Sequence, residues 1–279
     1  MKITKTSLEN YKYIYALNGF SISSKQNSLY KYTCFGSVIR TVESEELVFV
    51  SPMKWKDPFE RRFYKTDYSG FGFERPDIAC MCLTNKSTTN EEASWKMYVT
   101  PNDKALRLTY DFSVLCSFLE KYAEANQCTV YIGKVIYDFD KKEIEILHKP
   151  GKVNNSMYDV FFPSDSFGIE HYLSLMLIKR KSFQFENEVR IFVVKEGSLD
   201  FDKDNLLRIN GVDYDKTKLV SQIMIAPYEP LPDNDIMTPL RNKINSIESA
   251  EYKKILSAKV GCVVKQSQLY ANCNPLLKV

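Results

Sequence analysis

The chain has 279 residues, of which 44% are hydrophobic and 26% are charged, as in an ordinary globular protein and unlike a disordered one. Its 38 basic and 35 acidic residues leave a net charge of +3 and are scattered, which argues against bulk binding to duplex nucleic acid. The sequence shows no signal peptide or long apolar run and has an odd number of cysteines, 7, so we expect a cytoplasmic protein with free thiols and no membrane segment.

The length fits one large domain or two small ones, and no linker rich in Pro, Gly or Ser divides the chain. We therefore expect a single domain over 1–279. Residues 1–28 form a polar lead-in, 29–195 form the core that carries the motifs, and 196–279 complete it with a strand, a helix and a strand. The sequence does not indicate an oligomeric state.

Strands are predicted where apolar residues alternate or form short runs, and helices where they recur every three or four residues. Pro58 disfavours a helical conformation at Asp57, so a loop is expected around it. In chain order the pattern predicts a strand at 29–34, a helix at 37–45, a strand at 47–51, a loop at 53–60, a strand at 78–83, a helix that starts near residue 91 and ends before Pro101, a strand at 105–110, a helix at 112–124, a strand at 130–137, a helix at 168–181, a strand at 183–193, a strand at 219–226, a helix at 235–247 and a strand at 259–265.

The most informative segment is 183–193, whose alternation predicts a strand with Glu186, Glu188 and Arg190 on one face. The two acids repel each other, and Arg190 balances only part of that repulsion. The simpler explanation of these three charged residues is that they lie on an outer, solvent-exposed face of the sheet. The alternative is catalytic: when an N-glycosidic bond breaks, a carboxylate aimed at the ribose stabilises the positive charge, and a second carboxylate can orient or deprotonate an acceptor.

The two acids of this segment could instead hold a divalent metal ion. Two carboxylates with no nearby histidine make an incomplete ligand shell, so no metal site is predicted. A metal-dependent nuclease would need further acids, and only Asp57 or Glu60 could be recruited. The Asp57–Glu60 segment is more simply explained as a structured turn plugged by Phe59.

Five further residues are candidates for a nucleotide site, and each also has an ordinary explanation. Tyr32 can pack while Lys31 faces water, or the pair can contact a phosphate or ribose. Trp95 and Tyr98, at the i, i+3 spacing of one helix face, are usually core residues. Alternatively they wall a pocket for a planar base or nicotinamide ring, to which Thr84 offers a hydroxyl group.

Short motifs spread over most of the chain carry a family resemblance. They are Leu29-Tyr30-Lys31-Tyr32, Phe49-Val50-Ser51-Pro52, Asp57-Pro58-Phe59-Glu60, Cys82-Leu83-Thr84, Trp95-x-x-Tyr98, Lys179 and Phe185-Glu186-Asn187-Glu188-Val189-Arg190. In these motifs the chain resembles the bacterial family called domain of unknown function 2971. It departs from the family at Lys56, where Asn is frequent, and at 102–104, where a Gly often follows the helix.

The order of the motifs also resembles the ADP-ribosyltransferase fold. The resemblance implies an α+β fold in which a mixed, mostly antiparallel split β-sheet core is flanked by helices. It implies NAD as the substrate, with Lys31 near the first motif position and Thr84 near the second, where Tyr98 is its rival. Glu188 then stands at the third position, with Glu186 as the upstream acid. Arg or His is usual where this chain has Lys31.

The leading hypothesis is an NAD-dependent ADP-ribosyltransferase or NAD glycohydrolase, with an anti-phage defence or toxin system as its setting. Glu188 would bind the nicotinamide ribose and stabilise the cation, and Glu186 would address the acceptor. The acceptor could be a protein, a nucleic acid or water. The residues assigned to NAD binding are Lys31, Tyr32, Thr84, Trp95, Tyr98 and Arg190.

The alternative is a non-catalytic sensor or interaction module of a defence or mobile-element locus. For this module we expect the acids to be satisfied by basic neighbours, with no deep pocket beside them. For the enzyme we expect Glu188 to line an open cleft with Lys31 and the aromatic helix.

Overall fold

The computed structural model describes residues 2–22, 27–38, 46–85, 95, 105–149, 156–163, 166–210, 219–226, 238–259 and 262–267. The chain divides into two compact units. The first unit comprises Met1–Asn27, Leu47–Asn85 and Leu115–Val212, and the second comprises Ser28–Glu46, Lys86–Val114 and Asp213–Val279. Each unit is assembled from three separate stretches, so the division does not decide whether 1–279 folds as one domain, and the single domain stays a prediction.

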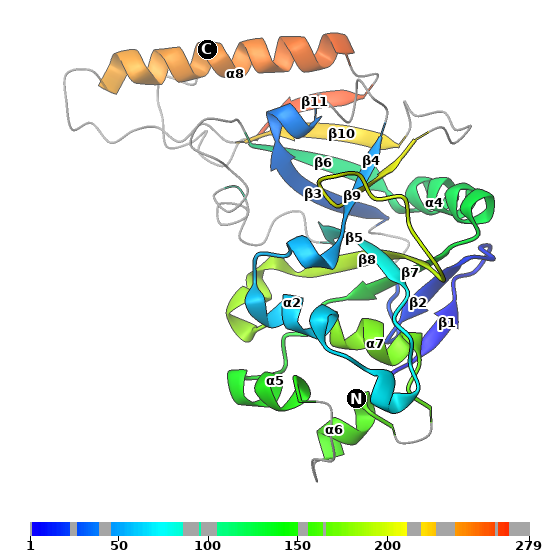
Figure 1. Ribbon diagram of the computed structural model, residues 1–279. Coiled ribbons are helices and arrows are strands. Elements are labelled where there is room, and N and C mark those ends of the chain that lie inside the picture. Colours follow the sequence, from blue (N-terminus) through cyan, green and yellow to red (C-terminus); the bar gives the residue numbers. More distant parts are fainter. Residues whose placement is uncertain are drawn as a thin grey trace. The chain divides into compact units, whose positions relative to one another are not determined.

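The first unit is built on a mixed sheet in which most strand pairs are antiparallel (Figure 1). Only β2 and β7 pair in parallel among its described strands. In spatial order the strands are β1 (Lys5–Ser7), β2 (Ile14–Leu17), β7 (Thr129–Lys134), β8 (Glu188–Lys195) and β5 (Asp77–Thr84), while β4 (Leu47–Val50) pairs with both β5 and β9 (Leu206–Ile209).

Helices cover this sheet, and the main core cluster lies between them and one sheet face. Phe192 and Val194 of β8 point to that face and pack with buried aromatic residues such as Phe63 and Tyr172. In Figure 1 a group of helices lies on one side of β7 and β8. These are α2 (Pro58–Lys65), α5 (Lys141–Leu147), α6 (Ser156–Phe161) and α7 (Ile169–Leu175); the chain also forms α4 (Phe112–Asn126) and the short 3-10 helices η1 (Pro52–Lys54), η2 (Ser69–Phe71) and η3 (Lys181–Glu186).

The second unit has its own strands and a long helix. Its strands are β3 (Ser28–Cys34), β6 (Ala105–Asp111), β10 (Val220–Ile225) and β11 (Val263–Gln266), and its helix is α8 (Thr238–Lys259). The first three strands pair antiparallel in this order, and β11 is parallel to β10. A small apolar cluster contains Tyr32, Trp95, Ala105 and Ala226.

The predicted fold class is confirmed at the level of an α+β protein with mixed, mostly antiparallel sheet flanked by helices. Each predicted strand from 29–34 to 130–137, and the strand at 219–226, has a counterpart, because buried strands carry a strong apolar signal. The ADP-ribosyltransferase-like arrangement stays a prediction. Within the described ranges, no helix has both the length and the apolar character needed to cross a membrane. The six cysteines of those ranges are free, as expected.

Two predicted boundaries near the candidate site are wrong. The loop expected at 53–60 ends at Asp57, because α2 begins at Pro58. Asp57 keeps the extended conformation that the following proline favours, and its side chain caps the helix. Pro58 occupies the first helical position, where its missing N–H costs no hydrogen bond.

The other error concerns the segment before β8. The helix expected at 168–181 ends at Leu175, and 181–186 forms the 3-10 helix η3. The strand expected at 183–193 therefore begins only at Glu188. Asn187 ends η3 with a left-handed conformation at φ 43°, so Glu186 does not belong to the strand.

The remaining helices and strands show smaller differences. The helix expected at 235–247 is α8, which begins at Thr238 and continues to Lys259, and the last strand, expected at 259–265, is β11. Most of the helix predicted at 37–45 and nearly all of the helix predicted before Pro101 lie outside the described residues.

Candidate functional site

The candidate site begins at the first residues of β8. Strand β8 pairs with β5 so that Glu188 lies opposite Thr84, and Arg190 lies opposite Cys82. Because side chains alternate along a strand, Glu188 and Arg190 share the face on which Phe192 enters the core. The two charged side chains are therefore buried: Glu188 is 4% exposed and Arg190 is 1% exposed.

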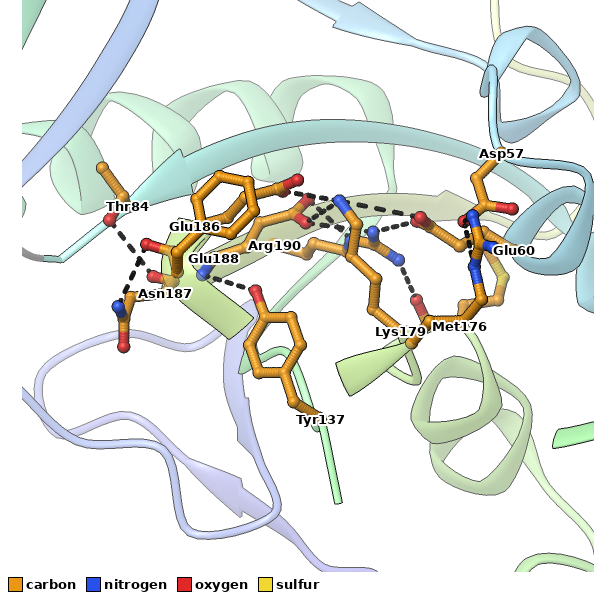
Figure 2. Close-up of polar contacts among 12 residues, drawn as sticks. Asp57, Glu60, Thr84, Tyr137, Met176, Lys179, Glu186, Asn187, Glu188 and Arg190 are labelled. Atoms are coloured by element: carbon orange, nitrogen blue, oxygen red, sulfur yellow. Dashed lines mark hydrogen bonds and ion pairs between the residues drawn. The ribbon is translucent and has the colours of Figure 1, made fainter. Parts of the chain in front are cut away.

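Five charged side chains of the first unit meet at this point, and we call them the acid–cation cluster. Figure 2 shows the ammonium group of Lys179 among the carboxylates of Glu60, Glu186 and Glu188, with Arg190 bridging Glu188 and Glu60. Glu60 comes from α2, Lys179 from the segment between α7 and η3, and Glu186 from the end of η3. Elements far apart in the sequence thus build one buried ionic network.

Each of the three guanidinium nitrogen atoms of Arg190 donates to a protein group. Its Nε donates to Glu188 Oε1 at 2.9 Å, and its Nη2 donates to Glu188 Oε2 at 3.2 Å and to Glu60. Nη1 donates to the backbone carbonyl of Met176. The ring of Trp55 lies 4.3 Å from the guanidinium carbon, a cation–π contact. Arg190 therefore holds two carboxylates in place inside the protein.

Lys179 is the second cation of the cluster. Its Nζ lies 2.6 Å from Glu186 Oε2, 3.0 Å from Glu188 Oε2 and 3.6 Å from Glu60 Oε1. Its backbone N–H donates to the carbonyl of Ile136 at 3.0 Å, which ties this segment to the chain that follows β7. The side chain of Lys179 is 12% exposed, so this is the side of the cluster closer to solvent.

The pKa values of Glu186 and Glu188 are shifted in opposite directions. Burial alone would raise the pKa of Glu188, but Arg190 and Lys179 outweigh it and lower this pKa to about 2. For Glu186 burial prevails over the attraction of Lys179 and raises the pKa to about 7. Burial opposes the charge of Lys179 too, yet Glu188 and Glu60 raise its pKa above the usual value. At neutral pH Glu188 is ionised, while Glu186 is close to its titration midpoint.

Backbone contacts fix the orientation of Glu188. Its N–H donates to the hydroxyl oxygen of Tyr137 at 3.0 Å. Its carbonyl oxygen accepts the N–H of Val135 at 2.9 Å. Next to it, the hydroxyl of Thr84 donates to the carbonyl of Asn187 at 3.2 Å. Thr84 thus stabilises the turn that delivers Glu186 and Glu188 to the same place.

Asp57 positions the helix that carries Glu60. Its Oδ1 accepts the N–H of Phe59 at 2.9 Å, and its Oδ2 accepts two bonds from Arg180, at 3.2 and 3.0 Å. We expect Asp57→Ala to lower the free energy of unfolding by about 1–2 kcal/mol, because a helix cap is lost together with the ion pair to the partly exposed Arg180. Asp57→Asn keeps the capping oxygen and should cost clearly less. Urea unfolding of both variants measures this, and equal losses would contradict a capping role.

The structure brings together part of the predicted site. Glu186, Glu188 and Arg190 meet in the cluster, and Thr84 lies directly beside Glu188. Arg190, which was expected to contact NAD, donates to Glu60, Glu188 and Met176. The burial and pairing of Glu188 match the contacts expected for a non-catalytic module.

The other predicted residues are not part of this cluster as described. Lys31, Tyr32 and Trp95 belong to the second unit. The rings of Tyr32 and Trp95 pack edge to face, 4.8 Å apart, and both are buried, as in the core explanation of these residues. Tyr98 lies outside the described residues, and NAD binding by these four residues stays a prediction.

Two cluster members, Glu60 and Lys179, were not among the predicted site residues, and Glu60 was considered only as a further acid for a metal-dependent nuclease. Both lie in motifs that carry the family resemblance, which is the one signal that could have singled them out. Periodicity could not, because Glu60 is 130 residues away from Arg190, its partner in the cluster.

One hollow of the first unit does not coincide with the cluster, and the described residues contain no group of candidate metal ligands. In the part of the chain that is described, no group of three or more His, Cys, Asp or Glu residues could hold a metal ion. A hollow of about 590 Å³ is lined by the end of α2 and the segment that leads to β5, including Asp67, Tyr68 and Arg75, and by no residue of the cluster.

Comparison of the chain with family models, with curated proteins and with solved structures gives no match. The resemblances to domain of unknown function 2971 and to ADP-ribosyltransferases stay predictions.

Proposed function

We propose that this protein cleaves the bond between nicotinamide and ribose in NAD, as an ADP-ribosyltransferase or an NAD glycohydrolase. The observation that carries the proposal is the unequal pairing of two neighbouring carboxyl groups: Glu188 contacts both Arg190 and Lys179, whereas the cation that Glu186 contacts is Lys179. Glu188 has a pKa of about 2, and Glu186 has a pKa of about 7. A reaction that needs one permanent negative charge and one proton acceptor near neutral pH fits this pair.

In the proposed reaction the C–N bond to nicotinamide breaks, and its electron pair leaves with the nicotinamide. The ribosyl group gains oxocarbenium character, which the ionised carboxylate of Glu188 stabilises in the transition state. The acceptor, water or a nucleophilic group of a macromolecule, forms the new bond to the same carbon. Glu186 takes the proton that the acceptor loses.

The contact between Glu188 and Lys179 limits how the ribose can approach Glu188. Glu188 Oε2 is held by Lys179 Nζ at 3.0 Å, so the ribose must replace or share that contact. The Lys179 side chain is 12% exposed, whereas that of Arg190 is 1% exposed, so the substrate would approach from the side of Lys179. Arg190 would stay in place and keep Glu188 ionised. Thr84, which lies opposite Glu188 in the first unit, keeps its proposed role in binding NAD.

The test is direct. Purified protein should release nicotinamide from NAD, detected by chromatography, and Asp202→Asn, which alters an exposed ion pair with Arg208, should release it at the same rate. Free ADP-ribose in equal amount identifies water as the acceptor, whereas nicotinamide without ADP-ribose identifies a macromolecular acceptor. No nicotinamide release, with or without added protein and nucleic-acid acceptors, would contradict the proposal.

A second candidate is the non-catalytic sensor or interaction module. The observation that favours it is the closure of the cluster: both oxygens of Glu188 already accept bonds from Arg190, and one also pairs with Lys179. A buried network of this kind can serve to fix a fold. For this candidate NAD should give neither nicotinamide nor a rise in the thermal unfolding temperature of the protein.

A further inference from the structure

The acid–cation cluster contains an unequal number of opposite charges. Glu60, Glu186 and Glu188 supply three carboxyl groups, while Lys179 and Arg190 supply two cations. All five side chains are between 1% and 12% exposed. A net charge in such a poorly solvated place is unfavourable, and binding one proton to one carboxylate would remove it.

The contacts show which carboxyl group is compensated least. Glu188 receives two bonds from Arg190, at 2.9 and 3.2 Å, and one from Lys179 at 3.0 Å. Glu60 pairs with Arg190 and, at 3.6 Å, with Lys179. Among the described residues Glu186 has Lys179 as its only cationic partner.

The other groups that face Glu186 do not favour its charge. Glu188 of β8 and Glu60 of α2 both oppose its ionisation. Tyr137, on the chain after β7, is a neutral phenol whose own pKa is raised, first by burial and then by Glu188. The state of Glu186 therefore depends on a single ammonium group, which it shares with two other acids.

We propose that the cluster holds one exchangeable proton on Glu186, and that Lys179 is the positioning residue that keeps this carboxyl group able to release it while Glu188 stays ionised. The inference deepens the proposed function, because it makes that site sensitive to pH. A protonated Glu186 cannot take a proton from an acceptor, so NAD cleavage should become faster as pH rises through the titration of Glu186. Protonation of Glu186 itself requires neither NAD nor its cleavage, so it can be tested separately.

The test follows the glutamate side chains by NMR, with 13C in their carboxyl groups, between pH 5 and pH 9. The parent protein should show one carboxyl signal that titrates near pH 7, and Glu186→Gln should remove it. Lys179→Met should move the midpoint upward by about one pH unit or more, because a cation in direct contact is lost. Lys179→Arg keeps the charge and should restore a midpoint close to that of the parent.

Glu145→Gln, at an exposed pair with Lys141, is the matched control and should leave the signal in place. A parent protein with no such titration, or a signal that persists in Glu186→Gln, would overturn the inference. So would a midpoint that is the same in Lys179→Met and the parent. If Lys179→Met does not fold, Lys179→Gln replaces it with the same expected direction. If the titration is found but NAD is not cleaved, the proposed function fails and the proton on Glu186 stands.

Discussion

Replacing Arg190 by methionine is expected to lower the free energy of unfolding by about 3–5 kcal/mol, a large part of the stability of an ordinary domain. The substitution keeps an apolar stem of similar length but removes the guanidinium group that serves Glu188 and Glu60. Both carboxylates are at most 5% exposed, so water cannot replace the lost partner. Chemical denaturation at pH 7.5 measures the change.

The size of this loss should depend on pH. In the parent the pKa of Glu188 is about 2, below its unfolded value of 4.5, so this acid stabilises the fold above pH 4.5. Without Arg190 burial prevails and the folded pKa rises above 4.5, which favours the neutral form. The penalty should therefore be largest at high pH and shrink as pH falls toward 4.5.

Arg208→Met is the matched control for Arg190→Met. It removes the partner of Asp202 at 2.8 Å, but the two side chains are 37% and 27% exposed, so solvent screens the pair and the expected loss is much smaller than for Arg190→Met. Equal losses in the two variants would show that the cluster contributes no more than a surface pair. A second substitution, Glu188→Gln, should return part of the stability to Arg190→Met, because it removes one unpaired charge.

Most of the strands were predictable because their signal is local and strong, whereas the short strands β1, β2 and β9 were not predicted. Strand β5 contains the apolar run from Ile78 to Leu83, and β8, which is buried up to Val194, contains the apolar run from Ile191 to Val194. Such a run identifies a strand without any knowledge of its neighbours. Glu188 and Arg190 interrupt the apolar pattern of β8. They belong to the acid–cation cluster, on the same sheet face as the core residue Phe192.

The start of α2 was not predicted because Pro58 is compatible with both a loop and the first turn of a helix. It keeps Asp57 out of the helical conformation, which suggests a loop, and it is well suited to the first position of a helix. Asp57 as a cap followed by Pro58 indicates a helix start, and the structure has this arrangement. Reading the pair as a turn removed Glu60 from any helix that could carry it to Arg190.

The segment before β8 was mistaken for a strand because alternation over a few residues is ambiguous. In a 3-10 helix side chains three residues apart lie on one side, so Phe183 and Glu186 can share a side there. Asn187 at positive φ was the local clue, since Asn adopts that conformation more readily than most residues. Glu186 and Glu188 nevertheless lie close together, because the turn at Asn187 directs both side chains to Lys179.

The cluster itself could be predicted only in part. Glu186, Glu188 and Arg190 are close in the sequence, and the repulsion between the two acids, which Arg190 balances only in part, already marked this segment as unusual. The contacts of Lys179 and Glu60 with the other three residues depend on long-range packing of α2 and of the segment after α7, which the periodicity of a single sequence does not show.

Glu188→Gln is expected to reduce nicotinamide release about a thousandfold, because an amide of the same shape cannot supply the negative charge that stabilises the ribosyl cation. NAD should still raise the thermal unfolding temperature of the variant, since binding and bond cleavage use different groups. Glu188→Asp keeps the charge but withdraws it by one methylene, and a displacement of this size should cost about a hundredfold. Rates at saturating NAD, compared with the circular dichroism of each variant, separate loss of chemistry from loss of fold.

The same variant distinguishes the two candidate functions. For an enzyme, Glu188→Gln loses activity far beyond any loss of stability, while Glu145→Gln, at an exposed pair, leaves both unchanged. For an interaction module, Glu188 matters only as a partner of Arg190 and Lys179, so its removal changes stability alone. A Glu188→Gln protein that is folded and cleaves NAD at the parent rate would exclude Glu188 as the stabilising carboxylate, because no residual charge would remain at that position.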